Sequence, residues 1–186
     1  MIKNWIAPNN EITFKLLYRA TRDGDSYEAF HSKCNEAPNI TFIKINDGNI
    51  IGGYTTIPWK CENNSYIPDK KAFIFSINFK EKHNLKKELN GQNAIYHDIS
   101  NYFCCYGYCG DDLAIHEKFL NNNNSYCCGN GNYESYDTNN LKMLGKDING
   151  KVYITVSELE VYKIYSDEID FYKDCPIIKS EKKQKI

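Results

Sequence analysis

The chain has 186 residues, of which 41% are hydrophobic and 14% aromatic, so it can bury a sizeable core as a single domain. Its 23 basic and 24 acidic residues leave a net charge of −1, which argues against binding to nucleic acid or to an anionic membrane surface. The N-terminal residues lack the apolar segment of a signal peptide, and no apolar run is long enough for a transmembrane helix. We therefore expect a cytoplasmic protein that does not insert into a membrane.

One clear helix is predicted near the N-terminus, at residues 27–35. Tyr27, Phe30 and Cys34 are spaced three and four positions apart, which places them on one apolar face of a helix. Asp25, with a glutamate three residues later, has the pattern of a capping box and is expected to begin this helix. The polar residues just before it have the composition of a turn.

Most of the remaining secondary structure is predicted to be β-strand. Apolar runs that alternate or are rich in β-branched and aromatic residues predict strands at 14–20, 40–45, 50–57, 72–79, 94–99, 112–119 and 152–165. The Asp47-Gly48 pair favours a hairpin between the second and third of these strands. Gly52 and Gly53, inside the third strand, indicate a bulge or a close approach to the backbone.

Polar segments separate the predicted strands. Residues 60–71 and 80–92 are rich in polar and charged side chains, and we assign both to loops, the second with room for one helical turn. Within 152–165 the alternation of apolar residues slips, so a bulge or corner is expected near Ser157.

At least six strands and one clear helix indicate a mainly β (α+β) fold. We predict a two-sheet antiparallel β-sandwich with a few short flanking helices. Residues 1–165 would form a single domain, and residues 166–186 would form a polar C-terminal tail.

The eight cysteines invite a metal or redox interpretation. Cys105 and Cys109 have the spacing of zinc ligands, and His116 lies between them and a second pair, Cys127 and Cys128. Adjacent side chains on a strand point to opposite faces, so the second pair suits a metal poorly. The favoured interpretation is buried or half-buried thiols that act as small apolar side chains, with a structural zinc site or redox-active thiols as alternatives.

No catalytic constellation is evident, so we expect neither an enzyme nor a bound cofactor. Asp111 and Asp112 are typical of a turn before a strand. Glu158 and Glu160 share one face of the last strand and would lie in solvent, unless they contact the N-terminal loop. We predict that a glutamate of this strand contacts that loop, for instance at Arg19 or Arg22.

Five segments in chain order resemble the TLDc domain, in the form common in protists. They are LLYRATRDGDSYEAFHSKC, a hairpin ending in GGYT and followed by a tryptophan, DKKAFIFSI, YGYCGDDLAI and SELEVYKI. The resemblance extends from Trp5 to Ile164. It implies a sandwich of two antiparallel sheets and a cytoplasmic role without an established catalytic mechanism.

The resemblance also implies a function. Animal relatives are tied to protection against oxidative stress, and several bind the peripheral part of the vacuolar proton pump (V-ATPase) and alter its assembly. The expected partner is therefore a protein, with those pump subunits as a candidate, while the oligomeric state stays open. The residues that carry the family pattern or could contact a partner are Arg19, Asp23, Gly24, Gly52, Gly53, Trp59, Asp111, Asp112, Glu158 and Glu160.

Two departures from the family pattern limit what can be transferred. Tyr106-Gly107 stands where the family usually has Phe-Gly. Residues 68–71 replace a Gly-x-Gly-Glu segment of the animal forms, so a role proposed for that glutamate does not carry over. A cysteine-based redox or zinc protein remains one alternative function, and a ligand-binding sandwich such as a carbohydrate module, with Trp59 exposed, is another.

Overall fold

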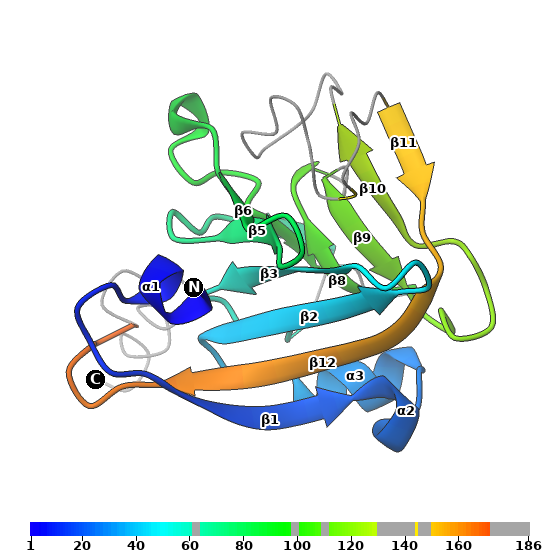
Figure 1. Ribbon diagram of the computed structural model, residues 1–186, viewed down its shortest axis with the longest axis horizontal. Coiled ribbons are helices and arrows are strands. Elements are labelled where there is room, and N and C mark those ends of the chain that lie inside the picture. Colours follow the sequence, from blue (N-terminus) through cyan, green and yellow to red (C-terminus); the bar gives the residue numbers. More distant parts are fainter. Residues whose placement is uncertain (61–63, 98–100, 109–111, 130–143, 145–149, 172–186) are drawn as a thin grey trace.

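Two six-stranded antiparallel sheets face each other in the computed structural model (Figure 1). It describes residues 1–60, 64–97, 101–108, 112–129, 144 and 150–171. Sheet A has the strand order β1-β12-β2-β3-β5-β6, and sheet B has the order β11-β10-β9-β8-β7-β4. The predicted fold class is confirmed.

The elements are short except for the last strand. The helices are α1 (Ile2–Ile6), α2 (Ala20–Asp23), α3 (Tyr27–Lys33) and the 3-10 helix η1 (Lys87–Leu89). The strands of sheet A are β1 (Thr13–Arg19), β2 (Asn39–Ile45), β3 (Ile50–Thr55), β5 (Phe73–Ser76), β6 (Glu81–Asn84) and β12 (Val156–Tyr165). Those of sheet B are β4 (Ser65–Ile67), β7 (Ile95–His97), β8 (Tyr102–Tyr106), β9 (Leu113–His116), β10 (Tyr126–Gly129) and β11 (Gly150–Tyr153).

The alternation of strand β5 builds two apolar clusters on opposite faces of sheet A. Ile74 points between the sheets and joins the main core. Phe73 and Phe75 point outward, where Trp5 of α1 covers them with ring centroids 6.3 and 6.2 Å away. The strand ends before Phe79, which is 40% exposed, so the predicted strand 72–79 is too long.

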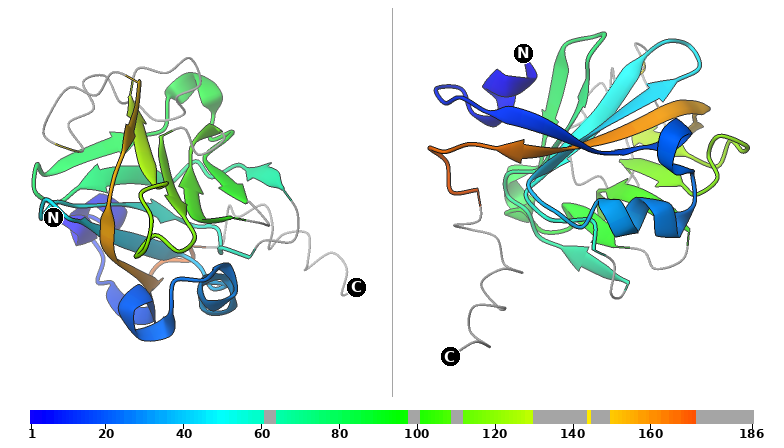
Figure 2. Two further views of the ribbon diagram at one scale, coloured as in Figure 1. Left: turned by 90° about the vertical axis from the view of Figure 1, so that its right-hand side faces the viewer. Right: turned by 90° about the horizontal axis from the view of Figure 1, so that it is seen from below.

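Helix α3 closes one end of the sandwich, where it packs between β1 and β8 (Figure 2). Its N-cap is Ser26, whose hydroxyl accepts a hydrogen bond from the Ala29 N–H. The prediction that Asp25 caps the helix was therefore wrong by one residue. Asp25 instead accepts a hydrogen bond from the backbone N–H of Leu120, in the loop after β9.

Strands β4, β6, β8 and β10 and helix α2 were not predicted from the sequence. Both β4, with only three residues, and β6, which is polar and charged, are edge strands, and β8 and β10 each contain two adjacent cysteines. The expected turn after β1 contains the four-residue helix α2. Edge strands are often short or charged, so β4 and β6 lack the apolar alternation of the inner strands.

The predicted strand 152–165 is two strands that belong to different sheets. β11 ends at Tyr153 in sheet B, and β12 begins at Val156 in sheet A, so Ile154 and Thr155 form the corner between the sheets. The pairing of β12 with β2 also shifts register between Val156 and Glu158. Both findings confirm the corner or bulge expected near Ser157.

Trp59 is fully buried, which corrects the expectation that it is exposed. Its indole N–H donates a hydrogen bond to the Asn39 side-chain oxygen at 3.0 Å, and its ring meets Tyr106 edge-on at 5.3 Å. Trp59 thus joins the end of sheet A to sheet B. The interpretation as a carbohydrate module loses the aromatic side chain on which it rested.

The other predictions for sheet A are confirmed at the β2–β3 hairpin. Gly48 has a φ of +87° at its tip, where the Asp47 carboxylate accepts a hydrogen bond from the Asn49 N–H. At Gly53, a Cβ atom would lie 2.3 Å from the Tyr106 ring of the opposite sheet. The glycine therefore allows the close approach that the sequence indicated.

None of the helices in the described part of the chain has the length and hydropathy needed to span a membrane.

We expect Gly53→Ala to lower the free energy of unfolding by about 1–3 kcal/mol, because the added methyl group would collide with a buried aromatic ring. Denaturant unfolding measures the effect, and Thr13→Ala, at an exposed position of β1, is the control. A Gly53→Ala protein as stable as the wild type would show that the sheets can separate at this contact without cost.

Candidate interaction site

The start of β12 contacts the turn after β1 through two glutamates. Arg19 and Glu160 lie opposite each other in the β1–β12 ladder, and the Arg19 Nε atom is 2.6 Å from the Glu160 Oε1 atom. The other carboxylate oxygen of Glu160 accepts a hydrogen bond from the Tyr162 hydroxyl at 2.7 Å. The predicted pairing between the last strand and the N-terminal loop is confirmed.

Glu158 fixes the same turn one step further along. Its carboxylate accepts hydrogen bonds from the backbone N–H of Thr21 at 3.2 Å and from the Thr21 hydroxyl at 2.5 Å. Because Glu158 and Glu160 project from one face of β12, both carboxylates reach α2 and the end of β1 together.

Asp23 closes the turn from within. It accepts hydrogen bonds from the Arg19 backbone N–H and from the Arg22 guanidinium, and Lys33 of α3 lies 3.5 Å away. The hydrogen bonds from Arg22 are the main reason that the pKa of the Asp23 carboxyl lies well below its usual range. Gly24 follows with a φ of +92°, and its carbonyl accepts a hydrogen bond from the Tyr18 hydroxyl.

A groove opens beside these glutamates on the outer face of sheet A. It has a volume of about 450 Å³ and is lined by Phe42, Lys44, Ile50, Ser157, Glu158 and Glu160. The apolar side chains come from β2 and β3, and the charges of both signs come from β2 and β12. Such a mixture of apolar contact area and opposite charges suits a polypeptide surface.

The two carboxylates of the groove are already engaged in hydrogen bonds. Both glutamates already accept hydrogen bonds from Arg19, Thr21 and Tyr162, so neither carboxylate is poised as a general acid or base. We therefore treat the groove, together with the turn that its glutamates hold, as the candidate interaction site.

The remaining residues of the family pattern do not line this groove. Gly52, Gly53 and Trp59 are buried and set the packing of the two sheets. Asp112 is also buried, and its carboxylate lies where a Cβ atom at position 107 would stand, which explains the glycine there. Asp111 lies outside the described residues.

Asp69 is a buried carboxylate that the sequence analysis did not single out. It accepts hydrogen bonds from the Thr55 and Thr56 hydroxyls at 2.7 and 2.9 Å, and from the N–H groups of Thr56 and Lys71. The polar composition of residues 60–71 predicted a loop, but nothing in the pattern indicated that Asp69 would be buried.

The described cysteines behave as apolar side chains. Cys34, Cys104, Cys105 and Cys127 are buried, and burial raises the pKa of the Cys34 and Cys104 thiols. A raised pKa lowers the fraction of reactive thiolate, which is the form that serves as nucleophile and metal ligand. The prediction of buried thiols is thus confirmed for these four.

The alternative zinc set is not assembled by the described residues. Cys105 packs on the outer face of sheet B, whereas Cys127 points into the core between the sheets. The His116 ring instead meets the Tyr102 ring edge-on, with the ring centroids 5.0 Å apart. Across the described part of the chain, no group of three or more His, Cys, Asp or Glu side chains is placed to hold a metal ion. Cys109 and the Cys128 side chain lie outside it.

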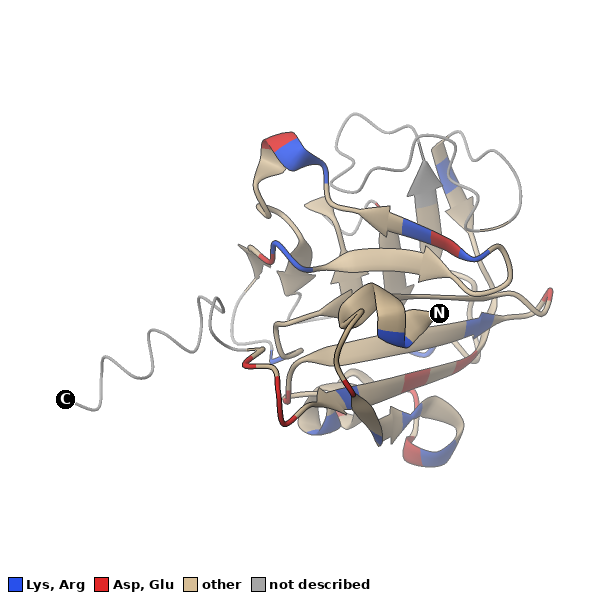
Figure 3. Cartoon of the chain, turned by 60° about the vertical axis from the view of Figure 1, so that its left-hand side comes forward, with Lys and Arg blue, Asp and Glu red and all other residues tan. Residues whose placement is uncertain are grey.

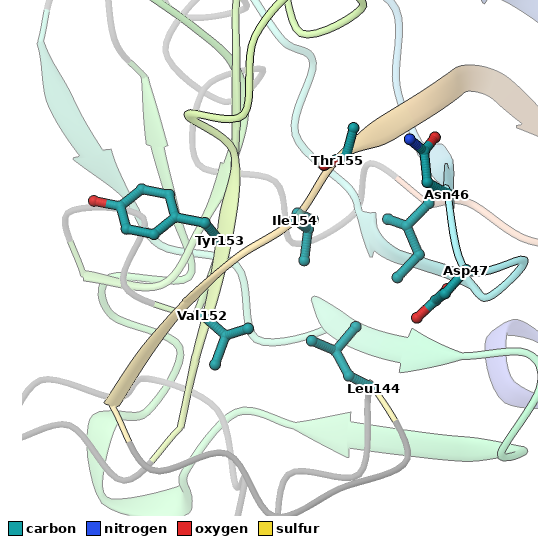
Figure 4. A pocket seen from close by; sticks show the side chains of 8 residues that line it. Asn46, Asp47, Leu144, Val152, Tyr153, Ile154 and Thr155 are labelled. Carbon is teal, nitrogen blue, oxygen red and sulfur yellow. The ribbon is translucent and has the colours of Figure 1, made fainter.

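A second cavity of about 470 Å³ lies between the β2–β3 hairpin and the corner that joins β11 to β12 (Figure 4). Leu144, Val152 and Ile154 form its apolar wall, and Asn46 and Asp47 lie at its rim. It contains no charged side chain besides Asp47 among the described residues that line it. We assign it no role.

A family model described as the TLDc domain matches residues 1–165 of the chain. None of the curated proteins compared with the chain matches it.

We expect Arg19 and Glu160 to be energetically coupled. A double-mutant cycle with Arg19→Met and Glu160→Gln, measured by denaturant unfolding, should give a stabilising coupling energy. The coupling should shrink as salt rises, because screening weakens partly exposed ion pairs. A coupling of zero at low salt would mean that this ion pair does not hold the turn.

Asp23 should make the stability of the domain sensitive to acid. Its pKa is lowered in the folded state, so its stabilising contribution is complete above the unfolded pKa of about 3.9 and is lost as the pH falls further. Asp23→Asn should therefore be less stable than the wild type at pH 6, and the difference should diminish below about pH 4. Asp167→Asn, at an exposed position, is the control, and a difference that does not change with pH would contradict the assignment.

Proposed function

The chain belongs to the TLDc domain family, and from this premise we propose that it is a protein-interaction domain without catalytic activity. The partner that we propose is the peripheral part of the vacuolar proton pump, and the proposed role is protection of the cell against oxidative stress, exercised in the cytoplasm. The family match over residues 1–165 is the observation that carries the proposal.

The groove beside β12 supports a protein partner. It joins apolar side chains such as Phe42 and Ile50 to charges of both signs at Lys44 and Glu158. The turn that forms its border is fixed by the hydrogen bonds of Glu158 and Glu160, so a partner would meet a surface that is already ordered.

The chemistry of the described cysteines supports an indirect role in oxidative stress. A thiol that scavenges oxidants directly must be accessible and must ionise easily. Cys34 and Cys104 are buried and have raised pKa values, so they are poor candidates for that reaction. Protection through the partner fits these side chains better than a cysteine-based redox mechanism.

Capture of purified pump tests the proposal. The immobilised chain should retain the purified peripheral subunits of the vacuolar proton pump, and Lys44→Glu should weaken that retention about tenfold by placing a third negative charge in the groove. Lys15→Glu changes the net charge equally at an exposed position of β1 outside the groove and should bind as the wild type does.

Two results would contradict the proposal in different ways. If the wild-type chain retained no pump subunit, the proposed partner would be wrong. If Lys44→Glu and Lys15→Glu bound equally well, the groove would not be the contact surface, and the interaction would have to use another face.

A further inference from the structure

A pocket with a basic rim lies on the outer face of sheet A, at the end formed by β5 and β6. Its volume is about 460 Å³, and its lining includes Lys70, Lys71, Lys82 and Lys87. No aspartate or glutamate is among the described residues that line it. Figure 3 shows basic positions on the loop before β5, on β6 and at η1, where β6 and η1 also carry an acidic position. The pocket therefore concentrates positive charge in a chain whose net charge is −1.

The floor of this pocket is apolar and aromatic. Trp5 from α1, Tyr54 from β3 and Phe171 from the segment after β12 all contribute, and Leu85 lies next to β6. Tyr54 and Phe171 are 3% and 6% exposed, so their rings are held in place by the surrounding packing. An apolar side chain could bury itself here as it would in the centre of a protein interface.

Lys82 belongs to the rim of the pocket and also contacts residues at and beneath its floor. Its ammonium group lies 4.3 Å from the centre of the Phe73 ring and donates a hydrogen bond to the Trp5 carbonyl at 3.3 Å. Within the part of the chain that the structure describes, no carboxylate pairs with it, and burial lowers its pKa. A half-buried cation in this position gains from an arriving anion, because the anion restores the interactions that burial has removed.

The shape of the site distinguishes between classes of anion. The lysines lie on three separate segments around the floor, and each is a point charge on a flexible stem. A compact polyphosphate would contact some of them but would leave the aromatic floor uncovered. A peptide that carries separate carboxylates on either side of an apolar residue can use both the floor and the rim.

We propose that this pocket binds an acidic segment of a partner protein, with one apolar side chain against Trp5 and Leu85, which are partly exposed, and flanking carboxylates against Lys70, Lys82 and Lys87. The site is separate from the groove beside β12, which lies at the other end of the same sheet face. The inference therefore goes beyond the proposed function and does not depend on the identity of the pump as a partner.

Fluorescence anisotropy with labelled synthetic peptides tests the proposal. A peptide with one leucine between two blocks of three glutamates should bind the full-length chain, and binding should weaken as salt rises. The same peptide with serine in place of leucine should bind more weakly. The double variant Lys70→Glu/Lys87→Glu should lose at least tenfold in affinity, because both side chains are exposed and reverse the charge of the rim.

Matched variants separate this site from general electrostatics. Lys15→Glu/Lys60→Glu changes the net charge equally at exposed positions that do not line the pocket, and it should retain the wild-type affinity, as should Lys44→Glu in the groove. Trp5→Ala should abolish the preference for leucine over serine while leaving the salt dependence. A melting temperature for each variant confirms that it is folded.

Three results would overturn the proposal. The first is no binding of the leucine peptide at millimolar concentration. The second is an equal loss in the Lys70→Glu/Lys87→Glu and Lys15→Glu/Lys60→Glu variants. The third is tighter binding of inositol hexakisphosphate than of the peptide, lost in Lys70→Glu/Lys87→Glu, which would assign the pocket to a phosphorylated ligand instead.

Discussion

The insertion of β12 between β1 and β2 is the constraint on which the rest of the structure depends. Thr13 pairs with Tyr165 and Arg19 with Glu160, so the first strand of the domain is hydrogen-bonded to its last. Pairing the first strand with the last closes a loop that spans most of the domain, and this closure costs conformational entropy before any contact offsets it. Sheet A can therefore be completed only when both ends of the domain are present. The carboxylates that hold the turn after β1 project from this same strand. The groove beside them therefore exists only in the folded domain.

The sequence predicted the parts of the fold that depend on local patterns. The β2–β3 hairpin, the bulge near Ser157 and the close approach at Gly53 followed from turn residues, from alternation and from glycine. The edge strands were missed because β4 has only three residues, too few to show an alternation, and because β6 is polar and charged, as edge strands often are. The division of 152–165 between two sheets was only partly foreseen, since a corner and a bulge look alike in one sequence.

Charge pairing was easier to foresee than burial. The contact between β12 and Arg19 could be predicted because two acidic residues share a strand face and a basic turn needs a partner. Trp59 was expected to be exposed, and Asp69 was assigned to a polar loop. Both errors have one cause, because a polar segment can still fold over a core when its donors and acceptors are satisfied there. The pocket rimmed by lysines could not be predicted from the sequence, because its lysines come from three segments that only the tertiary structure brings together.

The hydrogen bonds of Asp69 have a consequence for that pocket. By accepting from Thr55, Thr56 and the Lys71 N–H, this carboxylate ties the loop before β5 to the end of β3. The backbone that presents Lys70 and Lys71 is therefore ordered before any ligand arrives. Association then has to restrict only the lysine side chains and the incoming peptide, so most of the entropic cost falls on the partner. The buried carboxylate of Asp69 thus fixes the backbone of the basic surface that Lys70 and Lys71 form.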